Sequence, residues 1–562
     1  IAQAAEAVRN GFCVAGFLSY EAASGVDPVM TTHTAHDAVP RVWFGVYTAP
    51  ERLTGLPPLE KGNEAMAESL GEWRSDTSPA DYEAAIQRIK DYIYAGDTYQ
   101  VNYTLRLHTS FRGDPYALFC RLVASQRSRC SVYIDTGDLA VCSASPELFF
   151  QRDGRRIVLR PMKGTAARGL TWVDDQSAAE TLRHCAKNRA ENVMIVDMIR
   201  NDVGRIADPG TVNPSALFEI ETYPTVHQMV STVTAQTDAD LAQTLDALFP
   251  CASITGAPKV RTMQIIRELE RSARGVYTGA CGYWLPTGQA RFNVAIRTVV
   301  VDRKAGTAEC GVGGGIVWDS ASRSEYAECF TKARFLTQPV IPDLLVLESL
   351  RYDPAVGWFL LDEHIDRAAH TAAYFGYPFD PVAMRQSLAD AAAGHSGSTP
   401  LKVRWLLDAD GRMHTEIAVL SGDEAPWDVA VALDACRHDE VFLFHKTTYR
   451  TVYEAALKRY PGCRDVILVN DQGYVTESCY ANVVIDGGDG LLTPPLHCGL
   501  LAGTFRGDLL KRGEIREQAI TPAMLYSARR IWLVNSVRQW ISVRLQDSMS
   551  PDSFTFENSF KK

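Results

Sequence analysis

A lysine on a turn-like stretch and three glutamates on two expected helices are the residues best suited to chemistry in the first part of the chain. Lys163 lies in the run RPMKGTAARG at 160–169. A lysine buried among apolar neighbours has a lowered pKa, so its neutral amine can act as a nucleophile. Glu325 and Glu328 are three residues apart and share a helical face, and Glu191 belongs to another expected helix. Two such helices could hold Mg²⁺, which prefers carboxylates and water, against a substrate carboxylate.

The elements that must position these residues fall into two patterns. The first part of the chain mixes strand-like alternation, as at 42–47, with amphipathic helices, as at 81–94. Two prolines in the five residues 338–342 interrupt helical structure and mark a boundary. We therefore expect one domain at 1–337, a linker at 338–342 and a second domain at 343–562.

Composition restricts the class of protein. A chain of 562 residues is too long for one ordinary core, and 46% hydrophobic with 22% charged residues is typical of globular proteins. The net charge of −10 argues against nucleic acid or an anionic membrane as the main partner. No apolar run reaches the 18 residues of a membrane span. Thirteen cysteines without a C-x-x-C pair favour reduced thiols, and hence the cytoplasm.

Several motifs in the first domain resemble those of the chorismate-utilising enzymes, the family of anthranilate, isochorismate and aminodeoxychorismate synthases. The resemblance covers almost all of residues 1–335 and implies a large α/β domain with antiparallel sheets around the substrate pocket. The chain begins with Ile1 and lacks residues that family members carry before GFLSYE, so we expect a truncated N-terminus. The motifs are GDTYQVN at 96–102, RPMKGTAARG at 160–169, KNRAENVMIVDMIRND at 187–202, SITGAPK at 253–259 and GVGGGIVWDSASRSEYAE at 311–328.

The resemblance implies a role for each matching residue. Lys163 is the nucleophile that adds to chorismate and then gives way to ammonia, and Glu147 in SASPEL is the acid that protonates the departing hydroxyl. Glu191 and Glu328 bind Mg²⁺ directly, and Glu325 binds it through water. Anthranilate synthases usually carry alanine at the position of Lys163, so the lysine indicates the aminodeoxychorismate branch. The expected substrate contacts, some of them on a glycine-rich loop, are Gly164, Thr165, His227, Tyr277, Arg297, Gly313 and Gly315.

The second domain carries a different set of motifs, which in this order resemble the fold-type IV pyridoxal phosphate enzymes. That group includes branched-chain and D-amino-acid aminotransferases and aminodeoxychorismate lyase. The resemblance implies a two-layered domain that binds pyridoxal phosphate. The motifs are HKTTYR at 445–450, GYVTESCYAN at 473–482, LLAGTFR at 500–506 and VNSVR at 534–538.

Residue types in these motifs match the needs of pyridoxal phosphate chemistry. By resemblance, Lys446 forms the Schiff base and moves a proton, and Glu477 keeps the pyridine nitrogen protonated. Arg367, on an expected helix at 363–374, binds the phosphate. Lys446 follows an aromatic-rich stretch at 441–444 that we expect to be a strand. The expected backbone contacts to the phosphate come from Thr504, Phe505, Ser536 and Val537.

Together the two resemblances imply an α+β enzyme that aminates chorismate and then eliminates pyruvate, leaving 4-aminobenzoate for folate synthesis. The alternative is an anthranilate or other chorismate synthase fused to a branched-chain or D-amino-acid aminotransferase, and Lys163 separates the two. A regulatory subunit with one degenerate site is disfavoured because the reacting residues are all present.

The sequence also bears on partners. We find no glutaminase segment with a nucleophilic cysteine, so ammonia is expected from a separate glutamine amidotransferase subunit. Fold-type IV relatives are commonly dimers, which allows a homodimer through the second domain.

Overall fold

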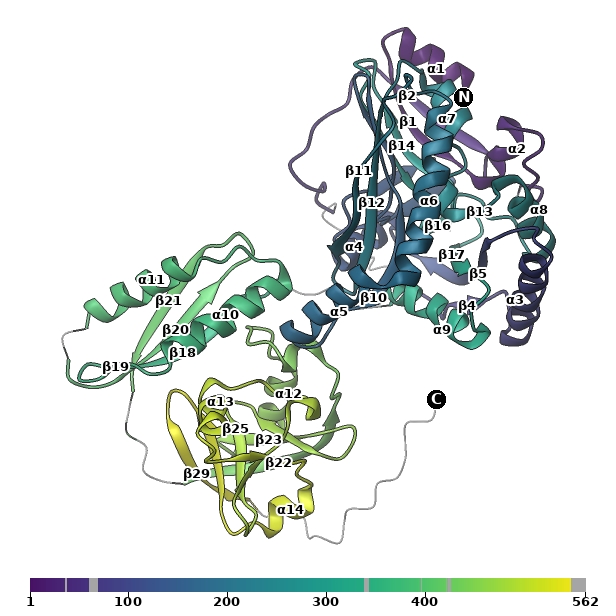
Figure 1. Ribbon diagram of the computed structural model, residues 1–562. Helices are drawn as coiled ribbons and strands as arrows, with labels where there is room; N and C mark the ends of the chain where they lie inside the picture. Colours follow the sequence, from purple (N-terminus) through teal and green to yellow (C-terminus); the bar gives the residue numbers. More distant parts are fainter. Residues whose placement is uncertain are drawn as a thin grey trace. The chain divides into compact units, whose positions relative to one another are not determined.

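The chain divides into two compact units, which we describe separately (Figure 1). By their internal contacts the first unit comprises residues 1–168 and 178–341, and the second comprises residues 169–177 and 342–562. The expected linker at 338–342 lies outside the described residues. The computed structural model describes residues 1–35, 38–59, 69–337, 343–395, 397–420, 422 and 426–546.

The first unit contains a nine-stranded sheet in which the pairings are antiparallel. This sheet carries Lys163 on β10, a strand at its edge, which pairs with β12 through Met162 and Val230. In spatial order the strands are β10 (Met162–Ala167), β12 (Val226–Gln236), β9 (Arg156–Arg160), β8 (Leu148–Asp153), β15 (Ala290–Val294), β14 (Ala280–Trp284), β1 (Cys13–Leu18) and β2 (Val42–Tyr47), with β11 (Asn213–Thr222) also on β12.

A second antiparallel sheet of the first unit contains the glycine-rich stretch, which we expected to be a loop. That expectation is wrong: Gly313 and Gly315 lie within β17 and pair with Thr104 and Asn102 of β5. A Cβ atom at Gly313 would lie 2.3 Å from the Tyr103 carbonyl oxygen, so glycine allows the strands to pack closely. In order the strands are β13 (Gly256–Ala257), β5 (Gln100–Arg112), β17 (Thr307–Ile316), β16 (Thr298–Asp302), β7 (Leu139–Ser143) and β6 (Val132–Asp135), with β3 (Ser69–Leu70) and β4 (Arg74–Ser75) on β5.

Helix α6 packs against the first sheet and brings Glu191 to β10. Ile195, Val196 and Ile199 of α6 are buried in the core of this sheet, and α6 runs beside β11 and β12 in Figure 1. The helix expected to carry Glu191 is therefore present, as Ala186–Gly204. The helices of the first unit are α1 (Ala2–Arg9), α2 (Ala23–Val26), α3 (Pro79–Tyr94), α4 (Pro115–Gln126), α6 (Ala186–Gly204), α7 (Leu241–Leu248), α8 (Lys259–Leu269) and α9 (Ser322–Ala333), and α5 (Trp172–His184) spans the boundary of the two units.

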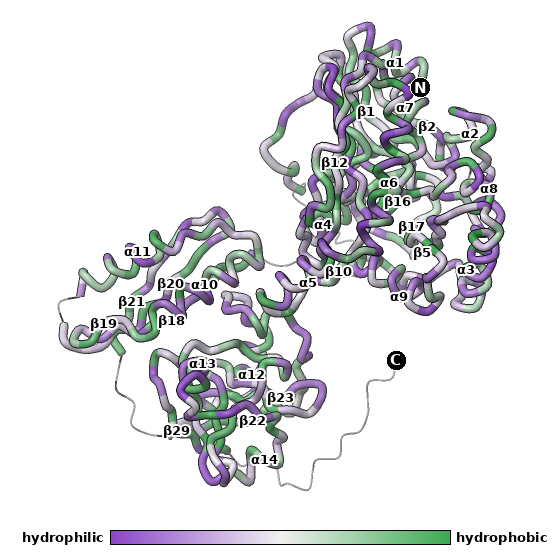
Figure 2. Tube along the Cα trace, viewed as in Figure 1, coloured by the Kyte–Doolittle hydropathy of each residue, from purple (hydrophilic) through white to green (hydrophobic). Residues whose placement is uncertain are grey.

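Helix α3 shows why such segments form helices here. The Ser78 side chain caps its first turn, and Pro79 occupies a position where its missing N–H is not needed. Tyr82, Ile86 and Ile89 recur at helical spacing and are buried in the core that contains β5. Figure 2 shows the corresponding alternation of hydrophobic and hydrophilic residues along α3.

The second unit has a small and a larger sheet. Helices α10 (Leu361–Phe375) and α11 (Pro381–Ala393) accompany the small sheet, whose strands in order are β19 (Gly357–Trp358), β18 (Val346–Asp353), β20 (Leu401–Leu407) and β21 (Met413–Val419). The larger sheet also pairs its first strand with β25, and its strands are β24 (Val475–Ser478), β23 (Asp465–Asn470), β22 (Trp427–Cys436), β29 (Gln539–Leu545), β28 (Ile531–Asn535), β25 (Asn482–Asp486), β26 (Leu491–Thr493) and β27 (Arg516–Glu517). The remaining helices are α12 (Thr451–Arg459), α13 (Thr504–Lys511) and α14 (Pro522–Ser527).

The aromatic-rich stretch before Lys446 does not form the expected strand. Val441–Leu443 is a short 3₁₀ helix, in which Leu443 is buried and Phe442 stacks on Phe375 of α10 at a ring distance of 6.1 Å. A short apolar run fits a buried helical turn as well as a strand, so tertiary packing decides its conformation. By contrast, α10 matches the helix expected at 363–374, and it ends at Gly376, whose φ of 74° suits a C-terminal cap.

The observed mixture of helices with mainly antiparallel sheets confirms the α+β class, although the larger sheet of the second unit also has parallel pairs between β22 and β23, β22 and β29, and β26 and β27. Within the residues that the structure describes, no helix is both long enough and apolar enough to pass through a membrane. All thirteen cysteines are free thiols, and most of them are buried.

Candidate functional site

Lys163 lies on β10 with its amine close to two carboxylates. Its Nζ donates a hydrogen bond to Oδ1 of Asn102 on β5, at 3.1 Å. Burial lowers the pKa of Lys163, although the nearby charges of Glu191 and Glu147 oppose this shift. A lowered pKa increases the fraction of neutral amine, which is the form that attacks carbon.

Glu147 is the nearest carboxyl suited to act as an acid. It follows β7 and is only 3% exposed. The Ser253 hydroxyl donates a hydrogen bond to its Oε1 at 2.6 Å. Burial raises the pKa of Glu147 to about 7, while the bond from Ser253 and the charge of Lys163 act in the opposite direction. A substantial fraction of the carboxyl therefore stays protonated near pH 7 and can release its proton to a leaving group.

The structure places the three expected metal ligands on two helices, α6 and α9. Burial raises the pKa of Glu191, and the charges of Glu325 and Glu328 add to this increase. Glu328 pairs with Lys332 at 2.7 Å, and the Lys332 ammonium also donates to the Gly313 carbonyl at 2.9 Å. Across the described ranges, no three or more His, Cys, Asp or Glu side chains form a ready-made metal site. Carboxylates that repel one another nevertheless provide the donors that Mg²⁺ prefers.

The expected substrate contacts on β10 are held by Gln228 of β12. Its side-chain amide donates to the Gly164 carbonyl at 2.9 Å, and its carbonyl accepts a bond from the Thr165 hydroxyl at 3.0 Å. Gly164 has a φ of 96°, which favours glycine, and it lies against Asn188 of α6. These contacts fix the strand end directly beyond Lys163.

Three other residues that we expected to contact the substrate each interact with another side chain of the first unit. His227 is fully buried, and its Nδ1 lies 3.1 Å from the Thr222 hydroxyl. The Tyr277 ring is buried beneath the Arg106 guanidinium, at 5.3 Å. Arg297 donates a hydrogen bond to the side chain of Gln126, and burial lowers its pKa to about 10.

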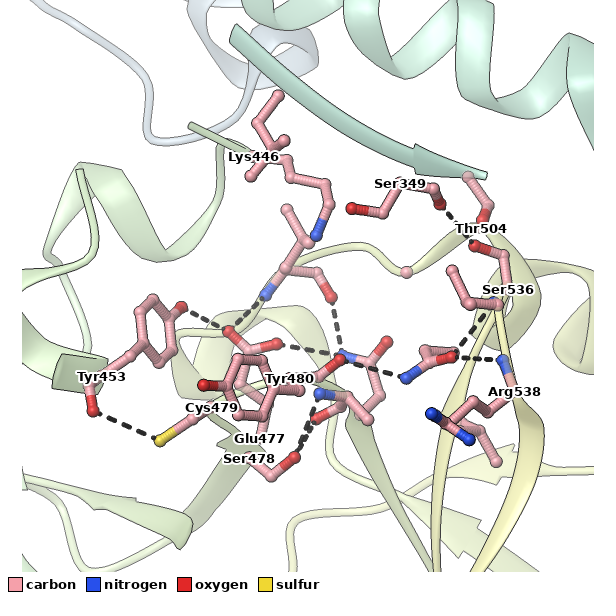
Figure 3. Close-up of a pocket in the computed structure, with 18 of the residues that line it drawn as sticks. Ser349, Lys446, Tyr453, Glu477, Ser478, Cys479, Tyr480, Thr504, Ser536 and Arg538 are labelled. Carbon is pink, nitrogen blue, oxygen red and sulfur yellow. Dashed lines mark hydrogen bonds between the residues drawn. The ribbon is translucent and has the colours of Figure 1, made fainter. Parts of the chain in front are cut away.

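In the second unit, Lys446 and Glu477 line a cavity of 570 Å³ (Figure 3). This volume falls in the roughly 300–1,000 Å³ range of small-molecule sites. The carbonyl of Lys446 accepts a bond from the Leu347 N–H at 3.0 Å, which fixes the loop to β18. Burial, with a smaller effect of the nearby Arg367 charge, lowers the pKa of Lys446 to about 8. The neutral amine is therefore accessible near physiological pH.

Glu477 is surrounded by hydrogen-bond donors. The Tyr453 hydroxyl donates to its Oε1 at 2.7 Å, the Leu501 N–H donates to the same oxygen at 3.2 Å, and the Asn482 amide donates to Oε2 at 3.3 Å. Burial raises the pKa of Glu477 to about 7 in spite of these bonds. A carboxylate held in this way can accept a proton-bearing partner in the cavity, such as a pyridinium nitrogen.

Arg367 lines the same cavity and is anchored by a buried carboxylate that the sequence reasoning missed. Glu348 is 1% exposed and accepts bonds from Nε and an Nη of Arg367, at 2.8 and 2.6 Å. His364 also contacts Glu348, at 2.7 Å. Despite burial, these partners lower the pKa of Glu348 to about 2. One edge of the guanidinium is thus fixed, and the arginine is oriented for an anion.

Some of the groups that we expected to bind a phosphate already form hydrogen bonds within the protein. Thr504 begins α13, where helix N–H groups favour anions, and its hydroxyl lies 3.3 Å from His364. The Ser536 hydroxyl donates to the Ser349 carbonyl at 3.2 Å, as Figure 3 shows. The Val537 N–H already donates to the Asn535 side chain, at 3.1 Å. The Phe505 side chain is buried in the adjacent core.

Sequence reasoning found the charged groups of both sites but missed the residues that hold them. Asn102 and Ser253 lie within quoted motifs, so these motifs were the available signal. Tyr453 and Glu348 lie outside the quoted motifs, and only the fold brings them to Glu477 and Arg367.

Among solved structures, the chain is similar in fold to the crystal structure of anthranilate synthase component I from Streptococcus pneumoniae TIGR4. The TM-score is 0.52 at 24% sequence identity, over 60% of this chain and 85% of that one.

Curated relatives match part of the chain. Aminodeoxychorismate synthase component 1 of Salmonella typhimurium is 41% identical over 270 residues, which are 48% of this chain and 59% of that one. The protein of the same name from Bacillus subtilis is 38% identical over 50% of this chain and 60% of its own length. Anthranilate synthase component 1 of Thermus thermophilus is 39% identical over 52% of this chain and 63% of its own length. The chain thus spans about three-fifths of the length of these relatives.

Two family models match consecutive parts of the chain. Residues 345–545 match amino-transferase class IV, which agrees with the second unit as a fold-type IV domain. Residues 1–338 match the chorismate binding enzyme model. Because this second match covers more than half of the 562 residues, the chain belongs to the chorismate binding enzyme family.

Proposed function

We propose that the chain converts chorismate and ammonia to 4-amino-4-deoxychorismate and then eliminates pyruvate to give 4-aminobenzoate. The observation that carries this proposal is the pairing of a lysine of lowered pKa, Lys163, with a carboxyl of raised pKa, Glu147. Displacement of a hydroxyl group by nitrogen requires a neutral amine and a protonated acid. A lowered pKa of the amine and a raised pKa of the acid favour these two forms. The relatives named aminodeoxychorismate synthase support the same substrate.

The amination would take place in two displacements at the first site. The neutral amine of Lys163 forms a bond to ring C2, both ring double bonds shift, and the C4 hydroxyl departs as water with the proton of Glu147. Ammonia then forms a bond to C4, both double bonds shift back, Lys163 leaves as a free amine, and the new ammonium group returns a proton to Glu147. The net change is the replacement of hydroxyl by amine, with one water released. Asn102, which accepts a bond from Lys163, orients the amine for the first displacement.

Mg²⁺ fits the carboxylates of α6 and α9. Glu191 and Glu328 would hold it directly, and Glu325 would hold it through water, with a substrate carboxylate completing the set. The ion would supply positive charge for that carboxylate. The Lys332 ammonium, now paired with Glu328, would shift toward the Gly313 carbonyl that it already contacts.

Pyridoxal phosphate fits the cavity of the second unit, where it would supply an electron sink for elimination. Lys446 would hold the cofactor, remove the C4 proton of the substrate and return a proton to the departing enolpyruvyl group. Glu477 would keep the ring nitrogen protonated, because Tyr453 holds its carboxylate in place. Arg367, fixed by Glu348, and the first turn of α13 would bind the phosphate.

Ammonia would come from a separate glutamine amidotransferase subunit, and the second unit would form a homodimer as its relatives commonly do. The thirteen free cysteines support a reducing compartment such as the cytoplasm.

The nitrogen source and the metal give a direct test of the amination. With chorismate, Mg²⁺ and ammonium, the purified chain should form aminodeoxychorismate, whereas glutamine should support almost none until an amidotransferase is added.

Glu328→Gln should slow amination by on the order of 10²-fold, since a metal ligand is lost. It should leave elimination from supplied aminodeoxychorismate unchanged, because the proposed elimination site is built from residues of the other unit. Product analysis by chromatography measures both; efficient use of glutamine by the chain alone would contradict the proposal.

The acid gives a second test, through Ser253. Glu147 must be protonated to act, so the amination rate should fall as the pH rises through about 7. The bond from Ser253 lowers the pKa of Glu147, so Ser253→Ala should move this fall to higher pH, by about one pH unit. Ser125→Ala is the matched control, since this buried hydroxyl donates to the Leu122 carbonyl within α4. A fall that stays in place, or moves to lower pH, would exclude Glu147 as the acid.

A further inference from the structure

Cys251 is a buried thiol beside the acid of the first site, and the proposed chemistry does not use it. It directly precedes the short 3₁₀ helix Ala252–Ile254 and is 5% exposed. Its Sγ lies 3.2 Å from the Ser253 hydroxyl, which in turn donates to Oε1 of Glu147 at 2.6 Å. The thiol, the hydroxyl and the carboxyl thus form a row of three hydrogen-bonded groups.

The backbone around Ser253 is held by Asn102, the residue that also contacts the amine of Lys163. The Asn102 side-chain amide donates to the Ser253 carbonyl at 3.0 Å, while its Oδ1 accepts the bond from Lys163 at 3.1 Å. The Asn102 N–H donates to the Thr255 carbonyl at 2.8 Å. The Ser253 hydroxyl oxygen therefore has a well-defined place, and only the direction of its single proton remains to be set.

The hydrogen bonds in this row require the thiol to donate to Ser253. A serine hydroxyl has one proton to donate, and its oxygen can accept further bonds. Since that proton is given to Glu147, the contact with Cys251 is a hydrogen bond only when the thiol is the donor. Burial, with a smaller effect of the Glu147 charge, raises the pKa of Cys251 to about 12, so the thiol keeps its proton near neutral pH.

Other groups also act on the two ends of the row. Burial raises the pKa of Glu147, and besides Ser253 the charge of Lys163 and the Met162 N–H oppose this increase. At the other end, the charge of Lys259 on α8 opposes the increase in the pKa of Cys251. Lys163, Met162 and Lys259 are unchanged by a substitution at Cys251, so such a substitution isolates the contribution of the thiol.

We propose that Cys251 is a positioning residue for the amination: its thiol donates to Ser253, so that Ser253 donates to Oε1 of Glu147 and the acidic proton stays on Oε2. This inference rests on the proposed function, in which Glu147 gives that proton to the departing hydroxyl. Because the Ser253 oxygen accepts from the thiol, it is a poorer acceptor for the proton of Glu147, which is then kept for the substrate. The thiol also strengthens the bond from Ser253 to the ionised carboxyl, which makes Glu147 a stronger acid.

Cys251→Ala tests this role through the pH at which the amination rate falls, measured at a fixed concentration of free ammonia. Without the thiol the bond from Ser253 is weaker, so the pKa of Glu147 should rise and the fall should move to higher pH. We expect a shift of about half a pH unit, less than in Ser253→Ala, because a thiol is a weak donor. The weaker acid should lower kcat about threefold and leave KM nearly unchanged.

Two further variants control for the loss of a buried thiol. Cys251→Ser should return the pH profile toward that of the wild type, since a hydroxyl group also donates to Ser253. Cys281→Ala removes a buried thiol of β14 whose pKa is raised by burial alone, and it should leave the profile unchanged.

A double substitution distinguishes positioning from simple packing in the core. In the Ser253→Ala background, Cys251→Ala should cause no further shift of the pH profile, because the bond through which the thiol acts is already lost. A thiol that only fills space would affect stability in both backgrounds and would not move the profile in either.

The S–H stretching band of Cys251 gives a readout that needs no turnover. Infrared difference spectra between the wild type and Cys251→Ser isolate this band from those of the other thiols. The band should move to lower frequency as Glu147 ionises near pH 7, because Ser253 then donates to a charged oxygen and accepts more strongly from the thiol. The movement should be absent in Ser253→Ala and in Glu147→Gln.

The outcomes separate this role from the proposed function. An unchanged pH profile in Cys251→Ala, a shift to lower pH, or an equal shift in the Ser253→Ala background overturns the proposal. An S–H band that does not respond to the ionisation of Glu147 overturns it as well. A band that follows Glu147 in a chain that forms no aminodeoxychorismate supports the role of the thiol and contradicts only the proposed amination.

Discussion

Lys163→Ala should slow the formation of aminodeoxychorismate by on the order of 10³-fold or more, because the variant lacks the group that we propose first displaces the C4 hydroxyl. The pKa of Lys163 is lowered by its burial near Glu147 and Glu191, so the wild-type amine is available for this step. Binding of chorismate should be largely kept, since the Mg²⁺ ligands are intact. Initial rates with ammonium, together with a chorismate binding titration, measure the two effects.

The same variant should eliminate pyruvate from supplied aminodeoxychorismate at the wild-type rate, and the chorismate titration shows that the first unit is folded. Lys304→Ala, at an exposed lysine paired with Asp138, is the matched control and should aminate normally. If Lys163→Ala aminates as fast as the wild type, ammonia attacks chorismate directly and the lysine has no covalent role.

Lys446→Ala should abolish the release of 4-aminobenzoate, so that aminodeoxychorismate accumulates from the intact first site. The wild-type protein with pyridoxal phosphate should be yellow, and borohydride should bleach the colour by fixing the cofactor to the chain. Burial lowers the pKa of Lys446 to about 8, so the free amine that would react with the cofactor is far more populated near neutral pH than in an ordinary lysine. Absorbance spectra and peptide mapping after reduction measure the linkage.

The control for this variant is Lys458→Ala, since Lys458 lies in the last turn of α12 and does not line the cavity. It should keep the colour, the label and the products of the wild type. A pyridoxyl label on any lysine other than Lys446, or 4-aminobenzoate release by Lys446→Ala at an undiminished rate, would refute the assignment.

Local sequence patterns predicted those elements whose burial repeats at a regular period. The alternation at 42–47 gives β2, and the apolar spacing at 81–94 gives α3, because in both cases one face of the element is buried. The stretches at 311–315 and 441–444 were predicted incorrectly. Glycine is needed at position 313 because the Tyr103 backbone of the neighbouring strand approaches closely. The stretch before Lys446 forms a 3₁₀ turn because Phe442 stacks on Phe375 of α10. Both causes lie far away in the sequence.

The candidate sites show the same division between local and long-range information. Motifs gave Lys163, Glu147 and the three glutamates because their residue types are required by the chemistry. The pKa of Glu147 depends on Ser253, which lies 106 positions away, and the orientation of Arg367 depends on Glu348 on another strand. Such partners are fixed by the fold, so spacing alone could not identify them. Sequence spacing also could not distinguish a buried structural histidine, such as His227, from a histidine that contacts a ligand.

The buried ion pair between Glu348 and Arg367 affects which residues would be retained in a descendant of this protein that had lost its activity. Removal of Arg367 would take its cationic partner from the buried Glu348 carboxylate and leave only the contact with His364, and breaking a buried ion pair destabilises a fold by about 3–5 kcal/mol. Selection for folding alone would therefore retain this arginine after the cofactor chemistry had been lost. Burial disfavours the charged form of Lys446, so the chain gives up folding stability to keep a lysine there. Among descendants of this protein, the persistence of Lys446 is evidence of continuing catalysis, whereas the persistence of Arg367 is not.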